Sequence, residues 1–205
     1  MKSIITLIIF FAILTSSGEA QIIRSYGLKV GTIAASQFFD YNINVTNPTT
    51  TRWGFDGGGF VEFLNVPYFS LLAELSYVQR GYSSTLKVST PAQPQGTGEY
   101  VTIRPRVDYV SLPLMAKVRF EAEEVIPYFM VGPRFDFLLG TNNSSLDYSP
   151  TDIGMTFGAG AQLSFFSPTQ FLVEGRFSPS FTKAFEGRYL TVKNNSFEIL
   201  IGMTL

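Results

Sequence analysis

The sequence predicts an all-β fold, an eight-stranded antiparallel up-and-down transmembrane β-barrel. The main observation is a period of two residues, in which apolar side chains alternate with polar or charged ones. Between Gln170 and Phe181, for example, Phe171 and Val173 share one parity, whereas Glu174 and Arg176 share the other. Successive side chains of a strand point to opposite faces, so this period indicates a sheet with one apolar and one polar face.

Eight segments carry this period and are expected as strands. They are 26–36, 53–64, 69–82, 108–120, 128–139, 152–165, 170–181 and the last eleven residues, 195–205. In that order, their apolar faces include Leu28, Phe55, Leu71, Val110, Phe129, Ile153, Phe171 and Phe197. Pro113, Pro133 and Pro179 fall inside these segments, where each removes a ladder donor, so they indicate either bulges or different strand ends.

The connections between the strands are alternately long and short. The long polar ones are 37–52, 83–107, 140–151 and 182–194, and the short ones lie at 65–67, 121–126 and 167–169. Tight turns at one end and longer loops at the other are typical of a barrel in the outer membrane of a bacterium.

The N-terminus has the pattern of a cleavable signal peptide, residues 1–20. Lys2 precedes an apolar run from Ile4 to Leu14, and a small-x-small site ends at Ala20. The run is too short for a helix to cross a hydrocarbon core of about 30 Å. We therefore expect export, followed by a single barrel domain at 21–205.

The composition excludes several function classes. The chain has no cysteine and no histidine, so it has neither thiolate nor imidazole metal ligands and no Ser-His-Asp triad. Its net charge of −1 gives no electrostatic footprint for nucleic acid. Charged residues make up 15% of the chain, against about 25% in soluble domains. We expect no catalytic, cofactor-binding or metal-binding residues.

The polar face is expected to line the lumen. Glycines such as Gly58 and Gly160 gather on it, as a narrow eight-stranded lumen requires, and its positive and negative charges nearly balance. Because buried charges must be paired, we predict an ion-pair network inside the barrel. Its members are Lys29, Asp56, Glu62, Glu74, Arg80, Lys117, Arg119, Arg134, Asp136, Glu174, Arg176 and Glu198. Asp152 lies on the same face.

Four motifs in a fixed order resemble a known family. They are Leu75 to Gly81, Tyr109 to Lys117, Pro127 to Pro133 and Gly158 to Gly160. In this order they resemble the PorT-like group of small outer membrane β-barrel proteins found in bacteria of the Bacteroidetes type. The resemblance implies a fold and a location, whereas the terminal Leu205 replaces the aromatic residue on which many such proteins end. Fold alone does not carry function.

Two functional interpretations stay open. In the first, a monomeric barrel contacts outer membrane lipid and binds envelope or secreted proteins through its long loops, or assists their secretion or assembly. In the second, a soluble lipocalin-like barrel encloses its apolar face around a small apolar ligand. A membrane enzyme is disfavoured, since Ser111 and Lys117 are about 20 Å apart along a strand. Residues expected in aromatic girdles at the membrane surfaces are Tyr26, Trp53, Tyr68, Tyr77 and Tyr128.

Overall fold

The eight long strands close into one antiparallel barrel. The computed structural model describes residues 22–41, 49–64, 66–94, 96–120, 122–143, 147–166, 169–187 and 190–205. The barrel strands are β1 (Ile23–Tyr41), β2 (Arg52–Phe63), β3 (Phe69–Gly81), β6 (Arg106–Arg119), β7 (Val125–Thr141), β8 (Thr151–Phe166), β9 (Thr169–Pro179) and β11 (Leu190–Thr204). Each pairs with its neighbours in chain order, and β1 pairs with β11 to close the circle. The predicted fold class is confirmed. The predicted signal peptide lies outside the described residues.

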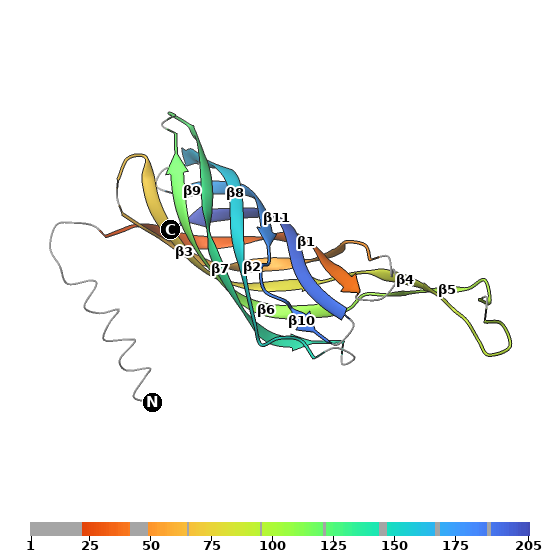
Figure 1. Ribbon diagram of the computed structural model, residues 1–205. Coiled ribbons are helices and arrows are strands. Elements are labelled where there is room, and N and C mark those ends of the chain that lie inside the picture. The colour runs from red at the N-terminus through yellow and green to blue at the C-terminus, as the bar shows by residue number, and fades with distance from the viewer. Residues whose placement is uncertain are drawn as a thin grey trace.

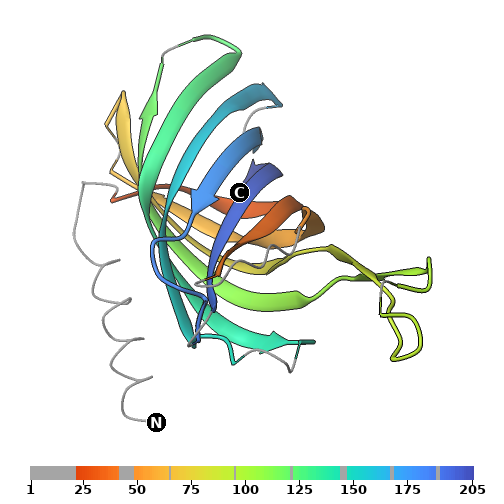
Figure 2. The ribbon, with the colours of Figure 1, turned by 45° about the vertical axis from the view of Figure 1, so that its right-hand side comes forward.

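The strand ends that the long connections join lie at one end of the barrel, opposite the C-terminus (Figure 1). At this end β4 (Ser84–Lys87) and β5 (Tyr100–Ile103) form a separate two-stranded hairpin that projects away from the barrel (Figure 2). The short β10 (Phe185–Glu186) pairs with β11. The short turns lie at the opposite end, so the predicted alternation of long and short connections is present.

Several segments predicted as loops are strands. Residues 37–41 belong to β1 and residues 190–194 to β11, and the two segments pair with each other, for example Gln37 with Asn194. The segment 83–107 contains the whole β4–β5 hairpin. The prediction failed here because strands that rise beyond the membrane no longer need an apolar outer face. The alternation therefore fades although the pairing continues.

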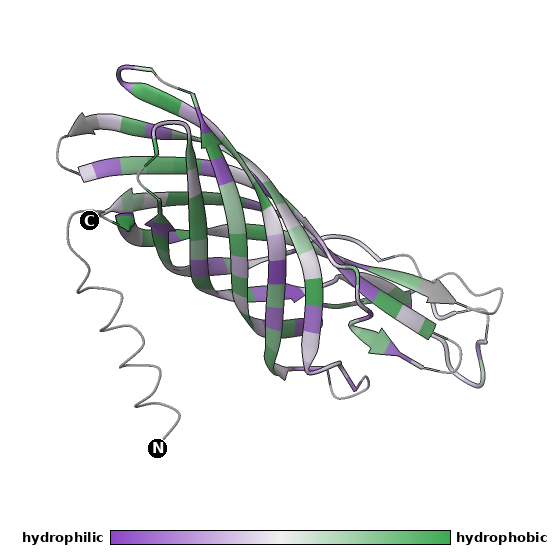
Figure 3. Cartoon of the chain, turned by 60° about the vertical axis from the view of Figure 1, so that its left-hand side comes forward, coloured by the Kyte–Doolittle hydropathy of each residue, from purple (hydrophilic) through white to green (hydrophobic). Residues whose placement is uncertain are grey.

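The apolar side chains face outward and the charged ones face inward. Leu28, Phe129 and Ile201 are exposed, whereas Lys29, Glu174 and Arg176 on the same strands or their neighbours are buried. Figure 3 shows the resulting bands of apolar and polar residues alternating along each strand. No helix that is long and apolar enough to span a membrane occurs in the described part of the chain.

Pro113 and Pro133 lie inside strands without forming a bulge. The register is unchanged on either side of each, but the β3–β6 pairing skips Leu112 and Pro113, and the β6–β7 pairing skips Gly132 and Pro133. Each proline therefore interrupts one ladder locally, and a bulge is the wrong interpretation at both positions. Pro179 is the last residue of β9, so there the predicted strand end was wrong.

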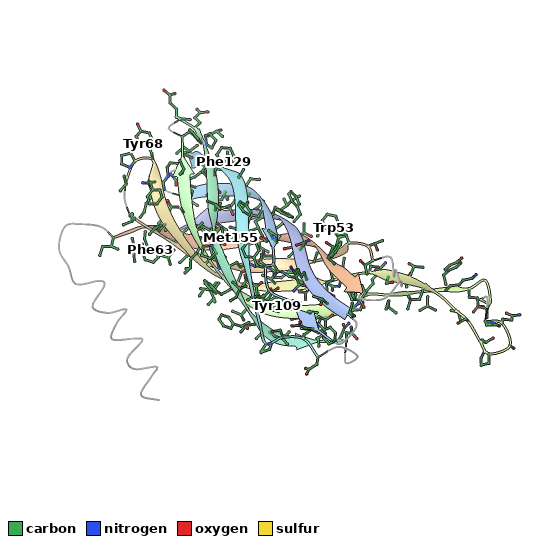
Figure 4. The ribbon with its side chains drawn as sticks, viewed as in Figure 1. Trp53, Phe63, Tyr68, Tyr109, Phe129 and Met155 are labelled. Atoms are coloured by element: carbon green, nitrogen blue, oxygen red, sulfur yellow. The ribbon has the colours of Figure 1, made fainter. Side chains whose placement is uncertain are left out.

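The aromatic residues near the membrane surfaces are partly as expected. Tyr26, Trp53 and Tyr68 are exposed, and Tyr77 is half-buried beside Phe55. Trp53 lies toward the long-loop end, whereas Tyr68 lies toward the short-turn end (Figure 4). The prediction that Tyr128 belongs to an aromatic girdle is wrong, because its side chain is 1% exposed and lies in the lumen. It shares the parity of Arg134 and Asp136, which is the signal that places it inside.

Candidate functional site

The lumen near the short-turn end is organised around one carboxylate. Glu62 accepts from Lys117 Nζ at 2.9 Å and is also paired with Arg119, which in turn donates to Ser70 Oγ at 2.6 Å. Arg24 Nε lies 3.5 Å from Glu62 at the rim. One buried acid thus faces two buried cations and a third at the mouth.

The middle of the lumen holds a second cluster, with two acids and two bases. Lys29 Nζ lies 2.5 Å from Glu74 and 2.7 Å from Glu174. Arg176 donates to both oxygens of Glu74 at 2.7 Å and is also paired with Glu174. The Tyr128 hydroxyl donates to Glu174 at 2.6 Å. Each carboxylate therefore has at least two charged or polar donors, the condition under which a buried ion pair is tolerated.

Apolar side chains fill the space around these two clusters. Inward-facing residues of five strands pack together: Phe60, Leu72, Met115, Tyr128, Met130 and Leu172. Lys29 lies over the Phe60 ring at 4.6 Å and Lys117 over the Tyr128 ring at 4.1 Å. Gly160 leaves the room that Tyr128 needs, because a Cβ there would come within 2.7 Å of the tyrosine ring. These contacts leave the lumen packed with side chains.

A third cluster lies nearer the long-loop end. Asp136 accepts from Arg80 at 2.5 Å, from Arg134 at 2.9 Å and from Ser111 at 2.6 Å. Asp152 accepts from Ser180, which in turn accepts from Arg134. Asp152 also accepts from Asn194 at 2.8 Å. The two acids are thus joined through hydroxyl and guanidinium groups.

All twelve residues predicted for the lumen network are buried, and ten of them form ion pairs. Asp56 and Glu198 are the exceptions, since neither forms an ion pair with another described residue. Glu198 accepts from Ser196 at 2.9 Å. The lumen face carries more acids than bases, which explains why some acids have no cation of their own.

The long-loop mouth is closed by groups that the sequence did not single out. Tyr148 donates to Gln37 at 3.2 Å, and Gln37 donates to Asn194 at 2.9 Å. Tyr148 also packs in a buried apolar cluster with Val107, Tyr109 and Ala184. Burial raises the pKa of the Tyr148 hydroxyl. Strand parity could have placed Gln37 inside, whereas Tyr148 lies in a loop and carries no periodic signal.

None of the catalytic alternatives forms in the described residues. Ser111 donates to Asp136 and Lys117 binds Glu62, so the two belong to different clusters. The described residues contain no group of three or more acidic side chains that could hold a metal ion.

Residues 19–186 match the family described as outer membrane protein beta-barrel domain. The chain belongs to this family. A comparison with curated protein sequences finds no match. Among solved structures, the outer membrane barrel is similar to Neisserial surface protein A, with 13% identity and a TM-score of 0.54 over 89% of this chain and 97% of that one. It is also similar to the outer membrane protein OprG of Pseudomonas aeruginosa, with 8% identity and a TM-score of 0.53 over 92% and 98%. A weaker likeness, with 11% identity and a TM-score of 0.43 over 93% and 98%, links it to the outer membrane protease OmpT of Escherichia coli.

The family and the exposed apolar face locate the protein in the bacterial outer membrane, in contact with lipid. The soluble lipocalin-like alternative is wrong, because such a barrel would enclose its apolar face and turn its charges to water. On β2 the outward apolar side runs from Trp53 to Phe63. At about 3.3 Å per residue and a strand tilt of about 40°, this segment extends about 25 Å along the barrel axis. This length matches the apolar band of outer membrane barrels.

Proposed function

We propose that this outer membrane barrel is a monomeric, non-enzymatic scaffold that binds envelope or secreted proteins through its external loops, or assists their secretion or assembly. The segments assigned to binding are 37–52, 83–107, 140–151 and 182–194. The lumen is assigned a structural role. Ten of its charged residues tie the strands together, because most of their ion pairs join strands that are not neighbours in the sheet.

The packed lumen argues against a pore. Ion-pair clusters at three heights and the apolar side chains between them occupy the interior, as expected for eight strands. No open conductance is therefore expected in planar bilayers. A stable conductance would contradict the proposal.

The β4–β5 hairpin is the observation that carries the binding role. Within the described residues β5 pairs only with β4, so its other edge has no described partner. Tyr100 and Val101, at 65% and 52% exposure, lie beyond the barrel and outside any apolar core. Free edges with exposed apolar side chains are suited to adding a strand from a protein partner.

The test removes the hairpin and leaves the barrel intact. Residues 84–103 are replaced by a short Gly-Ser linker, folding is checked by heat-modifiable gel migration, and proteins crosslinked in intact cells are identified by mass spectrometry. We expect proteins recovered with the native chain to be lost. The double variant Val101→Asp, Ile103→Asp should give the same loss. Thr102→Ser, an exposed position on the same strand, is the matched control and should not.

The proposal fails if the hairpin deletion recovers the same proteins in the same amounts.

The order of the four sequence motifs further supports assignment to the PorT-like group, and the N-terminal pattern supports cleavage after Ala20. Amino-terminal sequencing of the protein purified from membranes should then begin at Gln21.

A further inference from the structure

A polar cavity lies at the long-loop end of the barrel beside the exposed Trp53, where the apolar outer face of β2 ends. On β3 and β6 the outward residues Tyr77 and Val110 are paired, and the next outward pair toward the long loops is Gln79 with Asp108. The surface thus changes from apolar to polar within one step of the ladder. At such a boundary the acyl chains of an outer-leaflet lipid end and its headgroup begins.

The cavity is rich in guanidinium groups. It has a volume of about 290 Å³ and is lined by Thr51, Arg52, Trp53, Ser83 and Arg104. Arg52 Nη1 is buried and has no hydrogen-bond partner among the described residues. An unpartnered buried N–H of a charged group is costly, so this donor is suited to an acceptor that enters from outside.

The surrounding charge favours an anion. Arg104 and Arg106 lie close enough to Arg52 to repel its positive charge, whereas the carboxylate of Asp108 attracts it. Arg106 Nε is already paired with Asp108 at 3.1 Å. Arg104 is exposed and forms no ion pair with a described residue. Two guanidiniums are therefore left for a ligand, and guanidinium is the group that binds phosphate best.

An apolar groove begins next to this cavity. The groove, of about 790 Å³, is lined by Phe55, which is two residues below Trp53 on β2, and by Gly57 and Gly59. It continues across the outer faces of β1, β11 and β9, over Leu28, Ile201 and Phe171. The groove is open above Gly59, which has no side chain; a Cβ added there would meet nothing closer than 3.6 Å.

We propose that the cavity and the groove together form a binding site for a phosphorylated lipid of the outer leaflet. The phosphate group lies against Arg52 and Arg104, and an acyl chain lies in the groove that starts at Phe55. The cavity is lined by Trp53 and the groove by Phe55, two residues further along β2, and this proximity favours a membrane lipid over a free anion. Trp53, whose side chain lies toward the long-loop end (Figure 4), lines the cavity and is placed to contact the headgroup.

Trp53 also supplies the measurement, since it is the only tryptophan of the chain. The native protein in detergent micelles is titrated with phosphorylated lipid A, and tryptophan fluorescence is followed. We expect a saturable change. Lipid A from which the phosphates have been removed should bind about tenfold more weakly, because charge-assisted hydrogen bonds are lost.

Variants separate the two halves of the site. Arg104→Gln and Arg52→Gln should each weaken binding about tenfold, and Lys193→Gln, an exposed charge at the same end of the barrel, is the matched control. Gly59→Leu fills the groove without removing charge and should also weaken binding, whereas Gly140→Leu, another glycine with open space, should not. Heat-modifiable migration verifies that each variant is folded. Because Arg104 is exposed, its variant gives a result even if Arg52→Gln does not fold.

Two results would overturn the inference. Equal binding of the phosphorylated and dephosphorylated lipid, or unchanged binding by Arg104→Gln, would show that no phosphate site exists there. If inorganic phosphate at high concentration does not displace lipid A, the result supports assignment of the site to a membrane lipid. Inorganic phosphate that binds as tightly as lipid A, with Gly59→Leu unaffected, would refute it.

Discussion

The barrel interior and the β4–β5 hairpin distribute their side chains in opposite ways. In the interior, Glu74 and Arg176 are buried together in a lumen that lies within the membrane. On the hairpin, Tyr100 and Val101 are exposed at the end that faces the surrounding water. A charge is tolerated inside when fixed partners surround it, and an apolar side chain is left outside where a partner can cover it. The difference separates the part that makes the barrel stable from the part available for recognition.

The largest expected effect comes from removing one partner of the central cluster. Arg176→Leu leaves Glu74 and Glu174 facing each other with Lys29 as their remaining cation. We expect a loss of about 3–5 kcal/mol in the free energy of unfolding, measured by urea denaturation in micelles. Lys183→Gln breaks an exposed pair with Glu186 and should cost less than about 1 kcal/mol. Equal losses in the two variants would mean that the lumen pairs do not stabilise the barrel.

The same substitution in the two regions should have different costs. Val131→Arg places a charge on the lipid face of β7, which we expect to cost about 2–4 kcal/mol near the middle of the bilayer. Val101→Arg makes the same change on the hairpin, where water solvates the charge, and should stay within about 0.5 kcal/mol. Denaturation of both variants in lipid vesicles tests this. A similar cost at both positions would contradict the assignment of β7 to the membrane.

A smaller effect is expected from one hydrogen bond in the lumen. Tyr128→Phe removes the donor that lies 2.6 Å from Glu174 but keeps the ring that packs against Lys117. Because Lys29 and Arg176 still bind the carboxylate, we expect a loss of about 1–2 kcal/mol in unfolding free energy. Tyr26→Phe, at an exposed position, is the control. If the Tyr128 variant matches the control, the hydroxyl contributes nothing measurable.

Strand parity explains how much of this arrangement was visible in the sequence. Alternation puts Lys29, Glu74 and Glu174 on one face of their strands and Phe129 on the other, and their burial in the structure agrees with that division. Parity does not reveal which charges meet, because Arg176 reaches Glu74 across the lumen and the two are 102 residues apart. Such contacts depend on side-chain length and barrel width, which one sequence does not encode locally.

The hairpin and the mouth were less predictable for a different reason. The segment 83–107 has the polar composition of a loop, and its strands are held by each other rather than by an apolar face. Tyr128 shows the reverse error, since its aromatic character suggested a membrane surface although its parity with Arg134 pointed inward. Position in the pattern was a better guide than residue type.

The pairing of β1 with β11 constrains the order in which the molecule can be made. Gly27 lies opposite Thr204, so the pairing of β1 with β11 closes the cylinder. Until β11 pairs with β1, two long edges stay unsatisfied and cannot enter hydrocarbon without losing their hydrogen bonds. Closure of the barrel and full insertion into the bilayer core are therefore coupled. A chain that lacks β11 would keep both edges open and could not close the barrel.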